Sequence, residues 1–577
     1  MPAVKTAVDP ITVEVIRHKI GAMCDEMEVN LMRTAFSPTV YESRDFCAAL
    51  LDPEGQVIGQ ALGGNAIFLC DLTYAIADVY KVYGRDGIEP DDIFASNDPN
   101  VFGQHLNNVV LILPVFFEGR LVAFSAVRSH WVDIGGRDPG GWNVDTTEIY
   151  QEGLQIPTVK LFKRGRMDDE LARLIGLNVR DTDEVFGDLH AQVVGCQLGA
   201  RRFTEMLARY GEDTVFESIR IIWDQSETRV RQVIESIPDG SYTAKAVLDD
   251  DGLRRNVPVP LKITVRIDGS ELTVDYSDMP PQTPGPLNTR PPAAMSAARI
   301  TVKMFSTPFE FANEGAFRPV HVIVPEGTMF NAGPGAPVAQ WSPPLTTVVD
   351  MMLAALSSAM PDRLPAGSRN DIGGIKVYSP PGAKRPWRYT DALSGGWGAM
   401  PFRDGACGLK TVRHGDSKIL SAEMVESRAP VIIESEGLIP DSGGAGKFRG
   451  GLGTGRTFRV LEDGIGAFSM HRSDCPPWGM YGGEPGRPDM FHFRIPGREP
   501  FSSPKIDNVP LPAGSVVRME TAGGGGWGSP FERDPALVAL DVYRGYVSRE
   551  MALEKYGVAL DEDGNVDQER TKEKRHA

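Results

Sequence analysis

The sequence contains no long apolar run and no cysteine framework. No stretch of about 18 apolar residues occurs in the 577-residue chain, and no apolar core follows the first ten residues, so we expect a cytoplasmic protein that neither enters nor crosses a membrane. The cysteines are scattered without CxxC spacing, which predicts reduced thiols rather than disulfides. They occupy positions 24, 47, 70, 196, 407 and 475.

Motifs for binding ATP or for serine catalysis are also missing. The glycine runs at residues 450–453 and 523–526 lack the Gly-Lys-Ser/Thr ending of a phosphate-binding loop, so they favour structural turns. No GxSxG nucleophile elbow occurs. These absences give no reason to expect that this chain itself binds ATP.

Basic residues are fewer than acidic residues in this chain. The chain has 77 acidic and 60 basic residues, a net charge of −17 and a pI near 5.1. This balance opposes contact with phosphate backbones and anionic lipids, so we expect no nucleic-acid partner and no membrane surface. The hydrophobic content of 41% and the length are sufficient for two or more cores.

Hydrophobic periodicity predicts a mixed N-terminal part. Apolar residues at three- and four-residue steps predict a helix over residues 11–35, and alternation around turn signals predicts hairpins at 46–62 and 109–127. Helical spacing returns further along the chain. The helices expected there span residues 168–178, 186–210 and 213–237.

The second half of the sequence has the pattern of short strands separated by Gly/Pro turns. One apolar helix is expected at residues 346–360 and a helical tail at 535–556, followed by a charged end, 561–577, that we expect to fray. We therefore predict an α+β fold. The predicted division is an N-terminal α+β domain at 1–240, a β-rich domain at 241–530 and a helical tail at 531–577.

Two of the nine histidines, His105 and His130, flank the second predicted hairpin. In an antiparallel hairpin centred on this turn, the numbers of two residues that lie opposite each other sum to about 237. If the strands extend far enough, His105 lies opposite Val132 or Asp133. We therefore expect His105, His130 and Asp133 to converge. Imidazole and carboxylate together suit Zn²⁺, Mn²⁺ or Fe²⁺ without strong discrimination.

Further carboxylates, Asp45 and Asp98, precede the two hairpins and could complete such a site. The alternative is that His105 and His130 are ordinary core or surface histidines, because two histidines and an aspartate at loose spacing are common by chance. Residue pattern alone leaves both interpretations open.

Ordered motifs along nearly the whole chain resemble the hydantoinase B family, which also includes the C-terminal half of 5-oxoprolinases and large subunits of acetone and acetophenone carboxylases. The motif near the second histidine reads Ser-His-Trp-Val-Asp-Ile-Gly-Gly, and the last reads Gly-Gly-Gly-Gly-Trp-Gly. The matching segments are residues 9–15, 44–46, 96–99, 103–106, 129–136, 152–157, 313–319, 441–451, 476–479 and 523–528.

This resemblance implies a division of labour between subunits. A hydantoinase A-like partner would bind ATP and phosphorylate a carbonyl or bicarbonate, and this chain would complete hydrolysis or carboxylation, with small accessory subunits as further partners. The resemblance also implies a divalent metal, Mn or Zn, at Asp45, His105, His130 and, less surely, Asp133. If the histidines hold no metal, His105 or His130 would act as the catalytic proton-transfer group.

Two departures from the family pattern bear on the chemistry. The family usually has His-Leu-Pro-Asp where this chain ends in Asn108, and often has histidine where this chain has Phe68. Both changes remove a ligand and weaken metal affinity. Phe68, Trp131 and Trp142 would suit an apolar substrate. The leading hypothesis is an acetophenone-carboxylase-like subunit, followed by an ATP-dependent cyclic amidase and by a non-catalytic scaffold.

Overall fold

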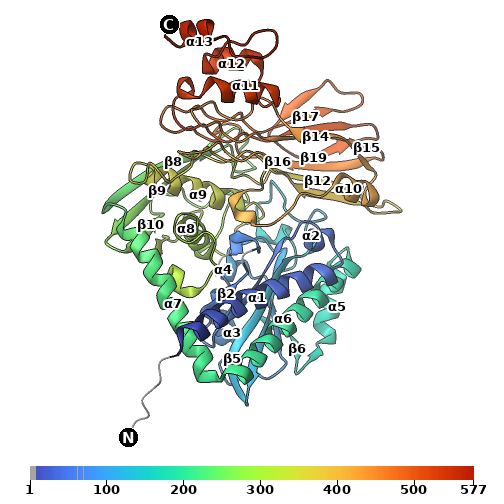
Figure 1. Cartoon of the computed structure of the whole chain (residues 1–577). Coiled ribbons are helices and arrows are strands. Elements are labelled where there is room, and N and C mark those ends of the chain that lie inside the picture. Colours follow the sequence, from blue (N-terminus) through green and yellow to red (C-terminus); the bar gives the residue numbers. More distant parts are fainter. Residues whose placement is uncertain (1–7, 62, 69–70, 577) are drawn as a thin grey trace.

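The computed structural model describes residues 8–61, 63–68 and 71–576. Its elements lie in three tiers in Figure 1: an N-terminal sheet with its helices, a β-rich middle part, and a group of helices at the C-terminal end. The predicted α+β class is confirmed, because helices occur with sheets whose described strands pair antiparallel except for one parallel pair, residues 272–275 with 320–323. No helix in these ranges combines the length and apolarity needed to span a bilayer.

The first helix, α1 (Pro10–Thr34), confirms the helix predicted at residues 11–35. Its N-cap is Asp9, whose carboxylate accepts a hydrogen bond from the backbone N–H of Thr12 at 3.1 Å. Pro10 has no backbone N–H, so it leaves no donor unsatisfied in the first turn of the helix. The buried face of α1 packs against α6 (Thr182–Tyr210), and both helices lie on the N-terminal sheet (Figure 1).

Seven antiparallel strands form the N-terminal sheet in the order β2-β1-β5-β4-β3-β6-β7. A Cβ on Gly199 of α6 would lie 2.4 Å from Ser125 Oγ, whereas Tyr80 packs edge-on against Phe124 at 5.9 Å. Ser125 and Phe124 are successive residues of β5, and successive strand residues point to opposite faces of a sheet. The helix α6 therefore covers one face, and the helix that carries Tyr80, α3 (Leu72–Tyr83), covers the other. The bounds are β1 Phe46–Leu51, β2 Val57–Gln60, β3 Ile93–Ser96, β4 Asn108–Phe117, β5 Arg120–His130, β6 Val159–Lys163 and β7 Arg166–Met167.

The remaining helices of this part include the other two that periodicity predicted. α5 and α7 lie within two residues of their expected limits. The bounds are α2 Pro38–Tyr41, α3 Leu72–Tyr83, α4 Pro99–Phe102, α5 Asp169–Asn178 and α7 Glu212–Glu235.

β4 and β5 form the predicted second hairpin, and their register decides where the histidines lie. Two residues with positive φ close the turn, Glu118 at 49° and Gly119 at 77°, which matches the twist that a two-residue hairpin needs. Next to the turn, the numbers of paired residues sum to 237, as predicted. Beyond a register shift between Val115 and Phe116 they sum to 238. Asn108 therefore pairs with His130 at the far end.

A four-stranded sheet, β11-β10-β9-β8, follows, and α8 and α9 pack together beside it. α9 (Ser342–Leu356) is the helix expected at 346–360 and begins four residues earlier, at a Ser-Pro-Pro start that supplies a helical first turn. The sequence analysis missed α8 (Pro291–Ser306), which lies within the half expected to consist mainly of short strands. The strands are β8 Gly240–Leu248, β9 Val259–Asp268, β10 Glu271–Asp275 and β11 Val320–Ile323.

Two further sheets confirm the β-rich second half. Their strand orders are β13-β12-β16-β19 and β14-β15-β20-β17-β18, and Phe468, Phe491 and Phe493 pack between them at ring distances of 5.1 to 6.3 Å. The helix α10 (Ala422–Arg428) precedes β14. The strands are β12 Gly374–Tyr378, β13 Arg388–Ala392, β14 Val431–Leu438, β15 Thr454–Val460, β16 Gly464–Ser469, β17 Met490–Arg494, β18 Phe501–Ser503, β19 Lys505–Leu511 and β20 Val516–Glu520.

Glycine-rich loops cross one another beside these sheets. A Cβ on Gly396 would lie 2.0 Å from the carbonyl oxygen of Gly451, and one on Gly524 would lie 2.0 Å from that of Trp397. Backbones can approach this closely only where no side chain intervenes. The glycine runs therefore serve backbone packing, as the sequence predicted, and we call this region the glycine crossing (residues 395–398, 443–451 and 523–526).

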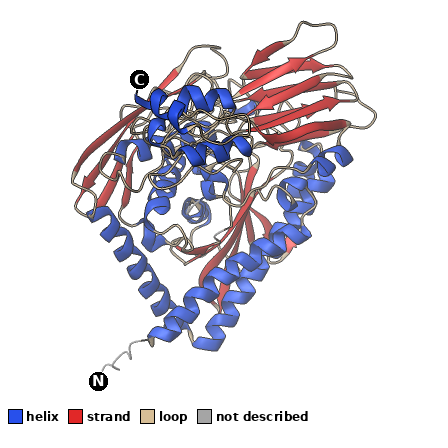
Figure 2. Ribbon diagram, turned by 45° about the horizontal axis from the view of Figure 1, so that its top comes forward, coloured by secondary structure: helices blue, strands red, loops and turns tan. Residues whose placement is uncertain are grey.

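The C-terminal helices pack against the glycine crossing, where Ala445 shares a hydrophobic cluster with Val538 and Ala552, and in Figure 2 they lie over crossing loops. α11 (Pro535–Tyr543) and α12 (Arg549–Tyr556) confirm the predicted tail. The expected fraying of residues 561–577 is wrong, because α13 (Gln568–His576) lies within this stretch. Arg575 of α13 donates to the carbonyl oxygens of Tyr556 at 3.0 Å and Arg533 at 2.7 Å, which docks the charged helix without an apolar face.

Three hydrophobic clusters make up the interior. The first runs from Val13 to Leu364, so the N-terminal sheet and the β8–β11 sheet share one core, and the others lie between the later sheets and under the C-terminal helices. The domain limits at 240 and 530 remain predictions. Among the described cysteines, positions 24, 47, 196, 407 and 475 are free, as expected, and Cys70 lies outside the described residues.

Candidate functional site

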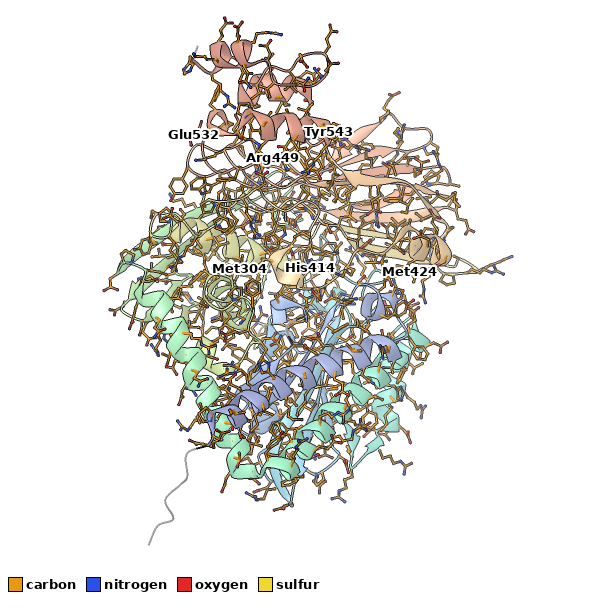
Figure 3. All side chains as sticks on the ribbon, in the orientation of Figure 1. Met304, His414, Met424, Arg449, Glu532 and Tyr543 are labelled. Carbon is orange, nitrogen blue, oxygen red and sulfur yellow. The ribbon has the colours of Figure 1, made fainter. Side chains whose placement is uncertain are left out.

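A cavity of about 100 Å³ lies where the N-terminal sheet meets the β-rich part. Figure 3 labels His414, which lines this cavity and lies at that junction. A space of this volume admits a small molecule or part of one. We name its two sides by their residues. The histidine wall consists of Asp45, Phe68, His105, Asn108, His130 and Trp142, and the basic segment is the stretch 410–418.

Strand ends build the histidine wall. His130 is the last residue of β5, and its backbone N–H donates to the carbonyl oxygen of Asp45, just before β1, at 3.0 Å. On the other side of β5, Asn108 begins β4 directly opposite His130. Three adjacent strands thus end at one edge of the sheet. Their polar side chains converge there although 85 residues separate the first from the last in sequence.

The predicted convergence of His105 and His130 is confirmed. Their ring centroids lie 4.9 Å apart at an angle of 69°. The Nδ1 atom of each ring is buried and has no hydrogen-bond partner among the described residues. A buried polar atom without a partner costs free energy, which marks these nitrogens as sites for a ligand, a water or a transferred proton.

Both imidazoles are held neutral. Burial, followed by His130 and Arg413, lowers the pKa of His105 well below its ordinary value. Burial also lowers the pKa of His130, and the nearby Asp45 carboxylate opposes that effect. A neutral imidazole with a free nitrogen accepts a proton or coordinates a cation, so either role is chemically open at neutral pH.

Asp133 does not join the histidines, contrary to the predicted convergence. Its carboxylate accepts hydrogen bonds from the backbone N–H and the guanidinium of Arg180, at 2.6 and 3.1 Å, and from the N–H of Gly140 at 3.2 Å. The prediction extended the hairpin pairing too far. The strand β5 ends at His130, and the backbone N–H of Trp131 donates to the carbonyl oxygen of Asn107. Asp98 is likewise engaged elsewhere, as the N-cap of α4.

The surroundings of the histidines do not fit a closed metal site. Asp45, His105 and His130 line the same cavity, but the Oδ1 atom of Asp45 accepts from Asn65 at 2.8 Å. Within the described ranges, no group of three or more His, Cys, Asp or Glu is placed to hold one ion. Cations on the basic segment also face the cavity and repel a dication. Divalent metal binding remains a prediction of the sequence, and no step below depends on it.

Sequence reasoning missed the basic segment. Within it, the guanidinium of Arg413 contacts Nε2 of His414 at 2.7 Å, Thr411 bonds the other nitrogen of that ring at 2.8 Å, and the Lys410 ammonium donates to the carbonyl oxygen of Ala392. A short 3₁₀ turn, η4 (Val412–His414), carries the arginine. The segment has no periodicity, and its only local signal is the adjacent Arg-His pair before a glycine.

Burial weakens the charges of the basic segment. It is the main cause that lowers the pKa of Lys410 to about 8 and that of Arg413 to about 10, and it keeps His414 neutral by lowering its pKa well below the ordinary value. Asp391 and Asp45 oppose these shifts at the two cations. Arg413 nevertheless stays protonated at neutral pH.

Aromatic residues supply the apolar part of the cavity. Phe68 and Trp142 line it, as expected, whereas Trp131 is fully buried and donates through Nε1 to Gln192 at 2.8 Å. Trp341 lies behind His105, with ring centroids 6.1 Å apart. The cavity therefore combines an apolar side, the three neutral imidazoles of His105, His130 and His414, and the cations Lys410 and Arg413.

The fold of this chain is similar to those of two enzymes of known structure. The crystal structure of ATP-dependent caprolactamase from Pseudomonas jessenii is similar, with a TM-score of 0.90, 31% identity, and coverage of 99% of this chain and 100% of that one. Acetone carboxylase in its nucleotide-free structure also has a TM-score of 0.90, covering 99% of this chain and 84% of that one, at 19% identity. The second likeness concerns the fold alone.

The chain belongs to the hydantoinase B/oxoprolinase family, whose profile matches residues 9–530. The beta chain of the caprolactamase of Pseudomonas jessenii is 33% identical over 98% of both sequences. One subunit of the putative D-/L-hydantoinase of Pseudomonas sp. (strain NS671) is 30% identical, also over 98% of both. The family expected from the motifs is therefore confirmed.

Proposed function

We propose that this chain is the subunit of an ATP-dependent cyclic amidase in which a phosphorylated lactam, hydantoin or oxoproline is hydrolysed. The observation that carries the proposal is the pair of neutral imidazoles, 4.9 Å apart, with unpartnered Nδ1 atoms in one cavity. Supporting it, relatives at 30% and 33% identity over the whole chain are named as subunits of a hydantoinase and a caprolactamase.

A neutral imidazole can serve this reaction as a general base. His105 or His130 accepts a proton from water as the water adds to the activated ring carbon, and the protonated imidazole then returns a proton to the departing ring nitrogen. Two waters are consumed: one opens the ring to an acyl phosphate, and the second releases inorganic phosphate and leaves a carboxylate. Phosphorylation makes the amide carbon electrophilic, which a histidine alone cannot do.

A partner is part of the proposal, because this chain has no phosphate-binding loop of the Gly-Lys-Ser/Thr type. A hydantoinase A-like subunit would bind ATP and phosphorylate the substrate, with small accessory subunits possible in such a complex. Enclosure of the cavity between two sheets suits a reactive phosphorylated intermediate, since bulk water would destroy it before the ring opens.

A ketone carboxylase is the second candidate, and the aromatic residues favour it. Phe68 and Trp142 line the cavity and would hold an aryl or alkyl ketone such as acetophenone. In that reaction the partner would phosphorylate bicarbonate and the enol, and this chain would shelter both until the carbon–carbon bond forms. The sequence favoured this function; the amidase now stands first because two relatives at 30% identity or more are named as subunits of a hydantoinase and a caprolactamase.

Turnover of ATP by the assembled complex separates the candidates. The chain is co-expressed with its hydantoinase A-like partner, and ADP release is measured with caprolactam, hydantoin, 5-oxoproline, acetone or acetophenone, each with and without bicarbonate. ADP release that requires a cyclic amide and ignores bicarbonate supports the amidase. A strict requirement for a ketone and bicarbonate refutes it in favour of the carboxylase. Full product formation without this chain would leave it the role of a scaffold.

A further inference from the structure

Arg413 differs from four other buried arginines of the β-rich part. Arg369, Arg456, Arg472 and Arg533 each have a carboxylate oxygen within 3.0 Å. Arg413 is 7% exposed, yet no carboxylate of the described residues lies within 4.0 Å of its guanidinium, and its Nε has no acceptor. A buried cation without an anion is unfavourable by several kcal/mol, so such a group implies a partner that arrives from outside.

Lys410 adds a second cation to the same cavity. Its ammonium is bonded to a backbone carbonyl rather than to an acid. Asp391 is the acid that acts on it most strongly, but this carboxylate is also engaged by the Arg456 guanidinium at 2.8 Å. No ion pair within 4.0 Å joins Lys410 to a carboxylate of the described residues, so its ammonium is a second cation that an incoming anion can contact.

The histidine wall supplies too little negative charge to balance these two cations. Its imidazoles, His105 and His130, carry no negative charge, and Asp45 is the one cavity-lining carboxylate of the described residues apart from Asp391. Lys418 at the rim adds further positive charge. The field inside the cavity thus favours an anion, although the whole chain carries a net charge of −17.

We propose that Lys410 and Arg413 form an oxyanion subsite that binds the carboxylate or phosphoryl group of the substrate, intermediate or product, while Phe68 and Trp142 contact its apolar part. The guanidinium offers planar N–H donors that match such oxygens, and its free Nε is one of them. This inference rests on the proposed function only for the identity of the ligand. Both candidate reactions generate a carboxylate and inorganic phosphate, so both need this recognition.

Binding by the isolated full-length chain tests the subsite without turnover. Calorimetric titration at pH 7 with inorganic phosphate and, separately, acetate is compared between wild type, Arg413→Gln, Arg413→Lys and Lys410→Met. We expect wild type to bind at least one probe. Arg413→Gln should weaken its binding at least about tenfold and Arg413→Lys less, because lysine keeps the charge but loses the planar donors. Binding of phosphate alone identifies a phosphoryl group, and of acetate alone a carboxylate.

Arg459→Gln is the matched control, because it removes one guanidinium from an exposed pair with Glu434 outside the cavity. It should bind the probes like wild type. Thermal unfolding gives a second readout: Arg413→Gln should not lower the melting temperature of the ligand-free protein, since it removes an uncompensated buried charge. Should Arg413→Gln fail to fold, Lys410→Met, expected to weaken binding at least about threefold, decides the question.

The subsite is refuted if wild type binds neither probe, or if the cavity variants bind as tightly as wild type and the Arg459→Gln control. Failure of the proposed function has a different signature. Retained anion binding without any ATP-dependent turnover would leave the subsite in place and reject the reaction, whereas full turnover by Arg413→Gln together with unchanged binding would reject the subsite alone.

Discussion

The two sides of the cavity are built in different ways. The histidine wall consists largely of strand ends whose positions follow from a hydrogen-bond ladder: β1, β5 and β4 stop at the same edge and present Asp45, His130 and Asn108 together. The basic segment has one 3₁₀ turn and a bend at Gly415, which has a φ of +52°. One side is fixed by regular pairing, the other by irregular backbone, so the chemistry of the first was predictable and that of the second was not.

The largest expected effect concerns the histidine wall. His130→Ala should lower kcat of the assembled complex by about 10²- to 10⁴-fold, the range for loss of a general base. Assembly with the partner should persist, because the ring nitrogen Nδ1 has no partner in the described fold to lose. The measurement is ADP release under saturating substrate, with complex formation checked by gel filtration.

Exposed His190 on α6 provides the control for that experiment, and His190→Ala should leave kcat unchanged. Wild-type turnover by His130→Ala would show that the basic segment alone carries the function of the cavity.

Adding one acid to the histidine wall should raise the affinity of the cavity for a divalent cation. Asn108 lines the cavity beside both histidines, and its Oδ1 has no partner among the described residues. Asn108→Asp supplies the carboxylate that family members carry there, so Mn²⁺ should bind at least about tenfold more tightly than to wild type in calorimetric titration. His105→Ala in the Asn108→Asp background should abolish that gain; an unchanged Mn²⁺ affinity would mean that Asn108 points away from any ion.

Titration of Lys410 should separate the basic segment from the histidine wall. Its pKa of about 8 means that the cation is present below pH 8 and lost above it, so affinity for sulfate, whose charge is constant, should fall by up to about tenfold between pH 7 and 9. The groups that act on it are Asp391, Arg413, Asp45 and Arg369.

In Lys410→Met the same titration should be flat over this interval, because Arg413 keeps its proton and both wall histidines are already neutral. A slope that survives in Lys410→Met would assign the titration to another group.

The smallest effect is expected just outside the histidine wall. Asp133 is bound by Arg180 and by two backbone N–H groups, so Asp133→Asn should change kcat by less than about threefold while lowering stability by about 1–3 kcal/mol. Turnover and thermal unfolding of the same sample provide the two readouts. A loss of activity as large as that of His130→Ala would show that Asp133 takes part in the reaction.

Sequence reasoning succeeded where local periodicity and local pairing decide the structure. The predicted hairpin brought His105 and His130 together because its register depends on a two-residue turn only about a dozen residues from His130. Asp133 failed because the extrapolation continued past the point where β5 ends. The α+β class and the long helices rested on strong periodicity and were correct.

The basic segment lay beyond that reasoning for a physical reason. Arg413 matters because it has no carboxylate partner, whereas Arg369, Arg472 and Arg533 each have an acid supplied from another stretch of chain, as Arg369 has from Asp489. Whether a buried charge is balanced depends on the tertiary structure, and no sequence pattern around residue 413 carries that information. The aromatic prediction was right for Phe68 and Trp142, and the prediction that Trp131 lies beside them was wrong, because its indole turns into the core.

The glycine crossing limits where this protein can change. At Gly443, Gly450 and Gly524 an added methyl group would lie about 2 Å from a carbonyl oxygen of a neighbouring loop. A library that randomises these positions should therefore return glycine almost exclusively among folded clones. Directed evolution towards new substrates should accordingly start at the cavity walls and leave the crossing unchanged.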